Sequence, residues 1–379
     1  MPPFEIYALK MKGAVRVGRR GLELEDTLPA VPSDTLFSAL TAALAACGED
    51  TAAFLQPFLT DPPRPPFLLT STFPYVGEVR FYPAPLDWSG ALSADALRDY
   101  GKRIKKVQYL SERLFLRLLS GERLDDYLFP KEDEQQPKNG VSLQGSQFWL
   151  TVEEAEPLPA IFNLKKEKVF ALPRQDVYKR ARQPHVTVDR IRYAPDIYHT
   201  VQIHFQPGCG LWFGVQWLAD ETHPSRALLR CALNALQFSG LGGKRAIGFG
   251  GFELCEGFPR FVELPAALPG HAAFLLSRYH PRPAELPAVL QDGRYQLVSV
   301  GGWCDPLGRE NLLRQRVLMI GEGSRLALPD LPAGDVCEVS PRQAGDLPHP
   351  IYRYGLACAA GSEERRVGKE CRSRWSPYH

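Results

Sequence analysis

The order of the apolar periodicities along the chain is the feature that most restricts its fold. Residues Phe4–Lys12 alternate between apolar and polar side chains, which predicts a strand, and Leu211–Leu218 predicts another. Leucines at helical spacing follow each strand, after Ser33 in the first case and over Ser225–Phe238 in the second. A strand at Phe252–Cys255 completes the series. The order strand, helix, strands with a long insertion, helix, strand predicts an α+β fold, a ferredoxin-like sheet covered by two helices.

The first helix begins where a side chain can cap it. Ser33 or Asp34 places an oxygen where it can accept the free backbone N–H groups of the first turn, and Gly48 ends the helix. Asp34 could instead be a catalytic carboxylate, because it follows a basic loop. The basic residues of that loop are Arg16, Arg19 and Arg20. Capping explains Asp34 with fewer assumptions and is the interpretation that we prefer.

The charges balance overall but are uneven along the chain. The sequence contains 45 Lys and Arg against 43 Asp and Glu, and a uniform balance of this kind argues against a polyanion partner. Residues 101–117, however, hold six basic residues and one acidic residue, and residues 165–192 hold nine and three. Either run alone could be a solvated surface. Together they provide the segregated charge that a phosphate-binding groove needs.

The most specific local motif is the glycine-rich segment Ser239–Gly251, between the second predicted helix and the last strand. Glycines let a backbone approach a ligand closely and adopt positive φ, so that consecutive N–H groups can converge on a phosphate. The spacing matches neither a P-loop nor a dinucleotide fingerprint. A tight turn is the alternative, but two basic residues inside the segment favour binding to a phosphate backbone. The candidate residues are Gly240, Gly242, Gly243, Lys244, Arg245, Gly248 and Gly250.

A second candidate site lies in the basic run, at Pro184–Arg190. Alternating residues predict a strand there, and Tyr193–Phe205 could return beside it as a hairpin partner. A basic ribbon that carries aromatic side chains can contact phosphates and bases. The residues selected here are Arg182, His185, Thr187 and Arg190. Taken alone, His185 is more simply a surface or hydrogen-bonded histidine.

Several function classes lack their sequence signals. No apolar stretch approaches the roughly 18 residues of a membrane span, and the first residues lack a secretory pattern, so a cytoplasmic protein is expected. The eight cysteines include no CxxC pair, so neither a zinc site nor a disulfide framework is indicated. The motifs of serine hydrolases and zinc peptidases are absent. We therefore predict no cofactor and no metal.

Five segments, taken in order, resemble one family. They are SDTLFSAL at residues 33–40, HVTVDR at 185–190, GLGGKRAIGFG at 240–250, GGW at 301–303 and HPIYRYG at 349–355. This combination resembles the RAMP superfamily, and specifically the Csm-type subunit at the crRNA 5′ end of type III-A CRISPR effector complexes. The glycine segment alone would indicate only some RAMP protein. The resemblance extends over about Phe4–Gly361.

The resemblance implies two ferredoxin-like (RRM-like) RAMP domains and a β-hairpin thumb. The first domain would span residues 1–258, with the thumb inserted at about 141–206, and the second would span 270–361. Residues 362–379 are polar, basic and without periodicity, which indicates a disordered or non-native tail. One departure from the family is Pro32, which stands where a histidine is frequent.

The resemblance also implies roles for the candidate residues. The glycine segment with Lys244 and Arg245 would hold RNA backbone, and His185–Arg190 would belong to the thumb at the first kink between guide and target. Charge, more than motif, adds further candidate RNA-binding residues: Arg19, Arg20, Lys102, Lys105 and Lys106.

The leading hypothesis is a non-catalytic RNA-binding subunit of a type III-A (Csm) interference complex. The resemblance implies that it binds the crRNA 5′ handle near target RNA, caps the backbone filament of RAMP subunits and docks the large polymerase-like subunit. The alternative is a RAMP endoribonuclease that cleaves precursor or target RNA. That activity needs a histidine base or a carboxylate that positions the phosphate, and the first loop offers Glu23, Glu25 and Asp26 without a histidine. A third hypothesis, a protein that meets acidic protein surfaces, predicts RNA binding no tighter than binding to any polyanion.

Overall fold

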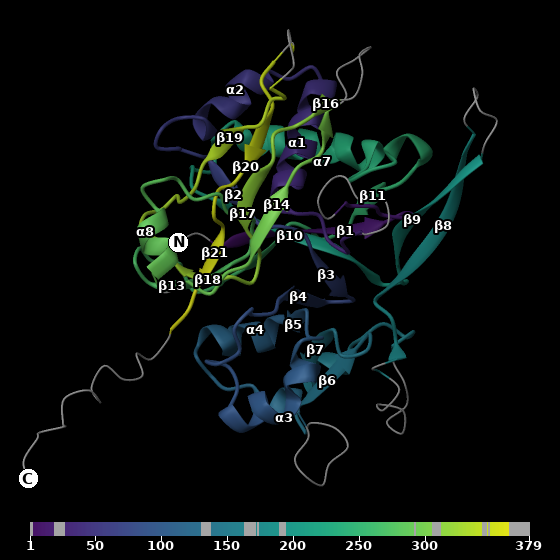
Figure 1. Cartoon of the computed structure of the whole chain (residues 1–379), viewed down its shortest axis with the longest axis vertical. Helices are drawn as coiled ribbons and strands as arrows, with labels where there is room; N and C mark the ends of the chain where they lie inside the picture. The colour runs from purple at the N-terminus through teal and green to yellow at the C-terminus, as the bar shows by residue number, and fades with distance from the viewer. Residues whose placement is uncertain are drawn as a thin grey trace, which may run out of the picture.

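One mixed sheet runs through both lobes of the molecule (Figure 1). The computed structural model describes residues 3–18, 27–129, 138–162, 172, 174–188, 195–291, 293–304, 312–342, 347 and 349–363. A two-stranded hairpin projects from one side of the upper lobe, and the C-terminal strands pack on the other side of that lobe. The chain is therefore α+β, which confirms the predicted class.

The centre of the upper lobe is the pair of strands predicted from apolar alternation. The upper strands are β1 (Phe4–Met11), β2 (Phe67–Leu69), β3 (Phe73–Val76), β10 (Cys209–Trp217), β11 (Phe252–Leu254) and β12 (Arg260–Val262). β1 and β10 pair antiparallel, from Phe4 opposite Gln216 to Leu9 opposite Leu211. Every residue of β10 is buried, so this strand lies inside the core on both of its faces.

Two helices pack together against this part of the sheet. They are α1 (Ser33–Ala46) and α7 (Ser225–Ser239), and both occupy predicted positions. Each helix buries the leucines that recur at helical spacing, namely Leu36, Leu40 and Leu44 in α1 and Leu229, Leu233 and Leu236 in α7. Beyond α1, the chain continues into α2 (Thr51–Leu55) and the short helix η1 (Gln56–Phe58). Phe54 and Phe58 there pack on Phe37 of α1 and extend its core.

The lower lobe continues the same sheet. Its strands are β4 (Val79–Pro83), β5 (Tyr109–Ser111), β6 (Gly140–Leu143) and β7 (Phe148–Thr151), and its helices are α3 (Ala94–Ile104), α4 (Glu112–Leu119), α5 (Asp125–Leu128) and α6 (Val152–Ala155). The strand order across both lobes is β11-β1-β10-β3-β4-β5-β7-β6. Ser93, Ser111 and Thr151 cap α3, α4 and α6 with their side chains. Among the described residues, every helix is too short or too polar to traverse a bilayer.

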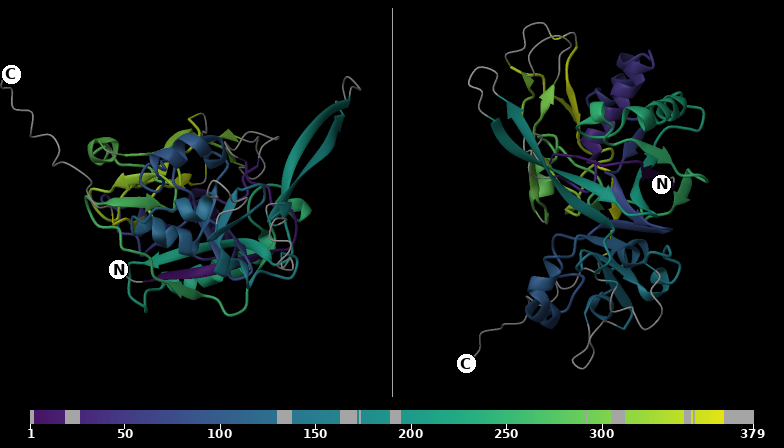
Figure 2. Two further views of the ribbon diagram at one scale, coloured as in Figure 1. Left: turned by 90° about the horizontal axis from the view of Figure 1, so that it is seen from below. Right: turned by 90° about the vertical axis from the view of Figure 1, so that its right-hand side faces the viewer.

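The projecting hairpin consists of β8 (Tyr178–Val188) and β9 (Pro195–Phe205). Both views of Figure 2 show it standing out from the body. Its antiparallel register runs from Tyr178 opposite Phe205 to Val188 opposite Pro195, so the two segments pair as the sequence indicates. The hairpin is shorter than the insertion expected at 141–206, because β6 and β7 belong to the lower part of the large sheet.

The C-terminal residues form a second unit with a small core of its own. Its elements are β13 (Ala272–Leu275), α8 (Leu286–Gln291), β14 (Leu297–Val300), β15 (Trp303–Cys304), β16 (Leu312–Leu313), β17 (Val317–Ile320), β18 (Arg325–Ala327), β19 (Val336–Glu338), β20 (Tyr352–Tyr354) and β21 (Ala359–Gly361). They make the three-stranded sheet β18-β13-β21 and several strand pairs. Leu275, Tyr279 and Leu326 lie in its core. The described part of this unit holds one helix, of six residues, where a ferredoxin-like domain has two.

Asp34 is the centre of the contact between the upper lobe and the C-terminal unit. Its fully buried carboxylate accepts hydrogen bonds from Nη1 of Arg278 at 3.2 Å and from Nη1 of Arg353 at 2.5 Å. The hydroxyl of Ser33 accepts the backbone N–H of Arg278 at 3.0 Å. The predicted capping role is therefore wrong, since the N-cap is Pro32 and no side chain caps α1. Two guanidinium groups buried beside the helix require a carboxylate partner, and Asp34 supplies it.

We expect the substitution Asp34→Asn to lower the free energy of unfolding by roughly 3–5 kcal/mol, because it removes the carboxylate that both buried arginines share and leaves Arg278 only the more distant Glu322, at 3.9 Å. Urea denaturation followed by circular dichroism measures this loss. Asp95→Asn is the matched control, since Asp95 also lies in the first turn of a helix but is exposed, and its ion pair with Arg98 is on the surface. An equal effect of the two substitutions would contradict the assignment.

The Asp34 ion pairs also predict a pH dependence. Burial raises the pKa of Asp34, but Arg278 and Arg353 together hold it below its ordinary value. Such a carboxylate stabilises the fold above its unfolded pKa of about 3.9, and the contribution is lost as the pH falls through the lower, folded pKa. The difference in unfolding free energy between wild type and Asp34→Asn should therefore shrink in acid. Denaturant titrations from about pH 7 down to about pH 3 test this, and a difference independent of pH would refute it.

Candidate nucleic-acid interface

The glycine-rich segment adopts a backbone that only glycine permits at several positions. It follows α7 and includes the short helix η3 (Arg245–Ile247). Gly242 has φ +87°, and a Cβ there would lie 2.4 Å from the carbonyl oxygen of Arg16. Gly250 has φ +74°, and a Cβ there would lie 1.9 Å from the carbonyl oxygen of Leu241. The glycines therefore allow the loop to close on itself and on the first loop of the chain.

Main-chain hydrogen bonds join the glycine segment to the first loop. The N–H of Gly243 donates to the carbonyl of Arg16, and the N–H of Gly250 donates to that of Ala14, both at 2.8 Å. Val15, between those two residues, exchanges hydrogen bonds with Ile203 of β9 at 2.8 and 2.9 Å. Three segments far apart in sequence thus meet at the base of the projecting hairpin.

Two cationic side chains lie at this meeting point. Lys244 adopts a left-handed backbone with φ 60°, and its Nζ donates a hydrogen bond to Oγ1 of Thr200 in β9 at 3.2 Å. Nη1 of Arg16 lies 3.6 Å from the place that a Cβ on Gly243 would occupy. Burial and the charge of Arg16 both lower the pKa of Lys244. Two neighbouring positive charges at one end of a glycine loop favour the binding of an anion between or beside them.

The other basic candidate of the glycine segment, Arg245, lies on its exposed side. Arg245 is exposed at the start of η3, and Ile247 in the same turn is 65% exposed. Phe238, just before the segment, is 86% exposed, with Nζ of Lys12 6.0 Å from its ring centroid. An exposed aromatic ring beside basic side chains is suited to stacking against a nucleobase.

The other predicted site residues lie on the hairpin, in the lower lobe, or outside the described residues. Arg182 is exposed on β8 opposite Val201, on the other face of the hairpin from Thr200. His185 and Thr187 also belong to β8, but their side chains are not described. Arg19, Arg20 and Arg190 lie outside the described residues. Lys102, Lys105 and Lys106 are at the end of α3 in the lower lobe, away from α7 and the hairpin (Figure 1).

Sequence reasoning selected the glycine segment but missed two of its contacts. Arg16 is in the basic first loop, yet nothing in the sequence distinguishes it from Arg19 and Arg20. Thr200 is a neutral residue in a predicted strand and carries no signal. Only the requirement for glycine at position 242 identifies Arg16, and that requirement comes from the close approach of two loops.

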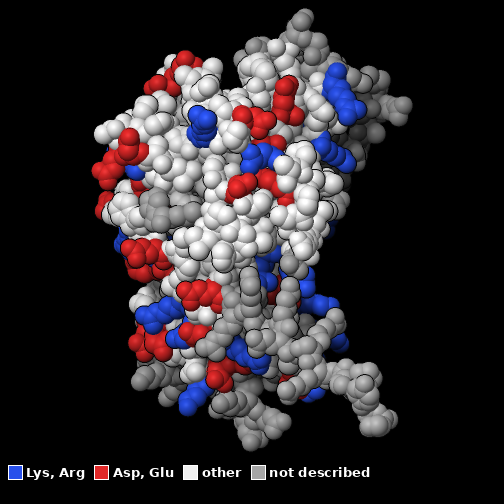
Figure 3. Space-filling model, turned by 90° about the vertical axis from the view of Figure 1, so that its left-hand side faces the viewer, with Lys and Arg blue, Asp and Glu red and all other residues white. Residues whose placement is uncertain are grey.

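The face of the molecule opposite the hairpin has a different character. Figure 3 shows acidic and basic side chains interspersed there, around a broad uncharged area of the upper lobe. A surface of mixed charge gives little net attraction for a polyanion. This face is therefore not our candidate for contact with nucleic acid.

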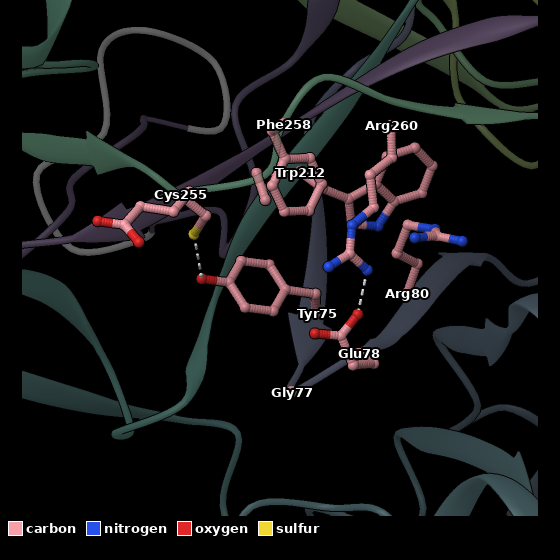
Figure 4. A pocket seen from close by; sticks show the side chains of 10 residues that line it. Tyr75, Gly77, Glu78, Arg80, Trp212, Cys255, Phe258 and Arg260 are labelled. Atoms are coloured by element: carbon pink, nitrogen blue, oxygen red, sulfur yellow. Dashed lines mark hydrogen bonds and ion pairs between the residues drawn. The ribbon is translucent and has the colours of Figure 1, made fainter.

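A cavity of about 130 Å³ lies where the turn between β3 and β4 faces the chain after β11 (Figure 4). Tyr75 and Cys255 form a hydrogen bond of 3.5 Å across it, and Trp212 and Phe258 contribute aromatic walls. Its basic residues are already neutralised, because Arg260 pairs with Glu78 and Arg80 pairs with Glu112. Burial raises the pKa of Tyr75, so its phenol stays protonated. These lining residues provide no paired nucleophile and base, and the cavity is not our candidate site.

The chain is similar in sequence to known proteins of one kind. Residues 269–361 match the family described as the CRISPR Csm4 C-terminal domain. The CRISPR system Cms protein Csm4 of Thermococcus onnurineus (strain NA1) is 24% identical over 342 residues, which cover 87% of this chain and 91% of that protein.

Two solved structures share the fold. A chain in the crystal structure of the Csm3–Csm4 subcomplex of the type III-A CRISPR-Cas interference complex has a TM-score of 0.63 and 17% identity, covering 95% of this chain and 100% of that one. A chain in the crystal structure of the Csm1–Csm4 cassette in complex with pppApA has a TM-score of 0.53 and 19% identity, covering 96% and 100%.

The fold and these matches make the chain similar to proteins of type III CRISPR-Cas complexes. Among those proteins, the matches in sequence are to Csm4.

Three alanine substitutions in the glycine segment separate backbone strain from steric conflict. Gly248→Ala imposes a side chain at φ +88° with nothing within 4 Å, and should cost about 1–2 kcal/mol of stability. Gly242→Ala adds the conflict with the Arg16 carbonyl and should cost more. Gly251→Ala is the control, because its φ is ordinary and its nearest contact is at 3.8 Å. Denaturant unfolding measures all three, and a Gly242 variant as stable as the Gly248 variant would show that the first loop does not pack as described.

Proposed function

We propose that the chain is a non-catalytic RNA-binding subunit of a type III-A CRISPR-Cas (Csm) complex, and that it holds the 5′ handle of the crRNA. The observation that carries the proposal is the meeting of Arg16, Lys244 and the glycine segment at the base of the hairpin. That place brings two cationic side chains together on a backbone that hydrogen bonds to the first loop hold in position, and basic side chains are the commonest protein contacts to phosphate groups.

The fold supports a closer description of the same proposal. Along the chain, helix α1 comes after β1 and before β2 and β3, and α7 comes after β10 and before β11. With the strand order β11-β1-β10-β3, this is the connection of a ferredoxin-like unit. We propose that residues 1–258 form such a domain, that 270–361 form a second RRM-like domain, and that the β8–β9 hairpin is the thumb near the first kink between guide and target.

The partners proposed are those that the similar structures suggest. Csm4 chains occur with Csm3 in one of them and with Csm1 in the other. By similarity, this chain would contact a backbone RAMP subunit and a large polymerase-like subunit, and target RNA would pass near its hairpin.

The proposal of a non-catalytic role is supported by the state of Asp34. This carboxylate was the catalytic alternative near the first loop, but it is fully buried and held by two arginines. A carboxylate in that position cannot reach a phosphate on the surface. Glu23, Glu25 and Asp26, the acidic residues of the loop, lie outside the described residues.

The test is the salt dependence of RNA binding by the double variant Arg16→Gln and Lys244→Asn. Asparagine is chosen at 244 because it tolerates the left-handed backbone there. Each lost phosphate contact should reduce the slope of log K against log salt by about 0.7 for single-stranded RNA, so the double variant should lose roughly 1.4. Fluorescence anisotropy with labelled handle RNA at several salt concentrations measures the slope.

The charge-matched control is the double variant Arg64→Gln and Arg123→Gln, which removes two exposed cations that lie outside every candidate RNA-binding segment. It should leave the slope unchanged if the interface is at the hairpin base. An unchanged slope in the Arg16 and Lys244 variant would sink the proposed interface. The same RNA should remain intact during incubation with and without Mg²⁺, and cleavage that one side-chain change abolishes would favour the endoribonuclease instead.

A further inference from the structure

Three side chains of the C-terminal unit that can ligate a metal converge at one place outside the proposed RNA interface. They are His280, after β13, Asp335, immediately before β19, and Cys337, in the middle of β19. Their ligand atoms all lie within 4.8 Å of one another, and each residue is partly buried. We propose that these residues form a site for a zinc ion, with a fourth coordination position open to water.

The donor set selects the class of metal. One imidazole nitrogen, one carboxylate oxygen and one thiolate sulfur are the three kinds of ligand that zinc uses, whereas Mg²⁺ and Ca²⁺ prefer oxygen alone. When Zn²⁺ binds, the Cys337 thiol loses its proton to solvent and a Zn–S bond forms. The charges of the thiolate and of Asp335 then balance the two charges of the ion. A neutral assembly suits a partly buried position.

The backbone holds the three residues in place before any metal binds. The backbone N–H of His280 donates to the carbonyl of Gly355 at 2.9 Å, and the N–H of Gly355 donates to the carbonyl of Asp335, also at 2.9 Å. A Cβ on Gly355 would lie 2.4 Å from the Cβ of His280. Glycine at this position therefore lets the His280 segment pack directly against the strand pair that carries the other two ligands.

The side-chain contacts also point the donors toward one another. Nδ1 of His280 and Oδ1 of Asp335 are 2.6 Å apart, in a hydrogen bond that zinc would replace. The thiol of Cys337 makes a long contact of 3.8 Å to the carbonyl of Arg353, so little is lost when the sulfur turns to a metal. Ligand atoms around tetrahedral zinc are roughly 3.4 Å apart, so the His280–Asp335 pair must open slightly and the more distant pairs must close by about 1.4 Å at most.

The proposed zinc site is next to the two arginines that bind Asp34. His280 is two residues after Arg278, and Cys337 is paired in register with Arg353. Both arginines bind Asp34, and β20, which pairs with β19, packs against α1 (Figure 1). A bound zinc would tie the two arginine-bearing segments to each other and so stiffen the junction. This role is independent of RNA binding and of the function proposed above.

The experiment measures zinc binding by the full chain after removal of any affinity tag and treatment with a chelator. It uses a Cys231→Ser background, because Cys231 and Cys47 lie close enough to interact on α7 and beside the end of α1, and could hold metal themselves. We expect one equivalent of Zn²⁺ per chain by isothermal titration. Cys337→Ser and His280→Gln should each weaken binding by about 100-fold or more. Cys304→Ser, which removes another buried cysteine of the same unit, should leave it unchanged.

Cobalt provides a second readout, whose main result comes from the chain without any substitution at the site. Co²⁺ bound through Cys337 should give a sulfur-to-cobalt charge-transfer band and the strong visible bands of tetrahedral coordination, and Asp335→Asn should diminish them without removing the side chain's volume. Equal zinc affinity in the Cys337 and Cys304 variants, or cobalt spectra without a thiolate band, would leave only a hydrogen bond between His280 and Asp335 and would overturn the proposal.

Discussion

The buried carboxylate of Asp34 is the interaction on which the arrangement of the two units depends. Arg278 and Arg353 come from separate segments of the C-terminal unit, and each is almost fully buried where it meets α1. Neither guanidinium could occupy that position without an anion. The aromatic ring of Tyr354 stacks on Phe37 next to these contacts, with ring centroids 4.7 Å apart, so that charge and apolar packing hold the same strand against the same helix.

The glycine segment, which follows α7, is held by a different set of contacts. Backbone N–H groups of the glycine segment donate hydrogen bonds to the first loop, and the first loop in turn pairs with β9. The hairpin base, the loop and two cations are therefore one connected structure. The proposed RNA interface does not depend on a single flexible loop, because three segments fix one another's backbone before a phosphate arrives.

Much of the fold could be predicted because it follows from local periodicity. The alternation in β1 and the helical spacing of Leu36, Leu40 and Leu44 specified elements that the structure confirms. The role of Asp34 could not be predicted, because its partners lie more than 240 positions away and a capping residue looks the same in sequence. The role of Arg16 could not be predicted for a related reason. Its importance comes from the approach of Gly242 to its carbonyl, a tertiary contact that no spacing along the chain records.

The anchoring of the hairpin at one end gives it the mechanics of a lever. Each strand has 11 residues, and at about 3.4 Å per residue the hairpin is roughly 35 Å long. Its contacts with the body include the Val15–Ile203 bridge, the bond from Lys244 to Thr200, and hydrogen bonds of Tyr178 to Gln144 and Gln147. Pro195 lies eight residues beyond Ile203, or roughly 27 Å, so a rotation of about 5° at the bridge displaces it by roughly 2 Å. If an anion draws Lys244 away from Thr200 and the base of the hairpin rotates, the far end of the strands therefore moves further than the base does.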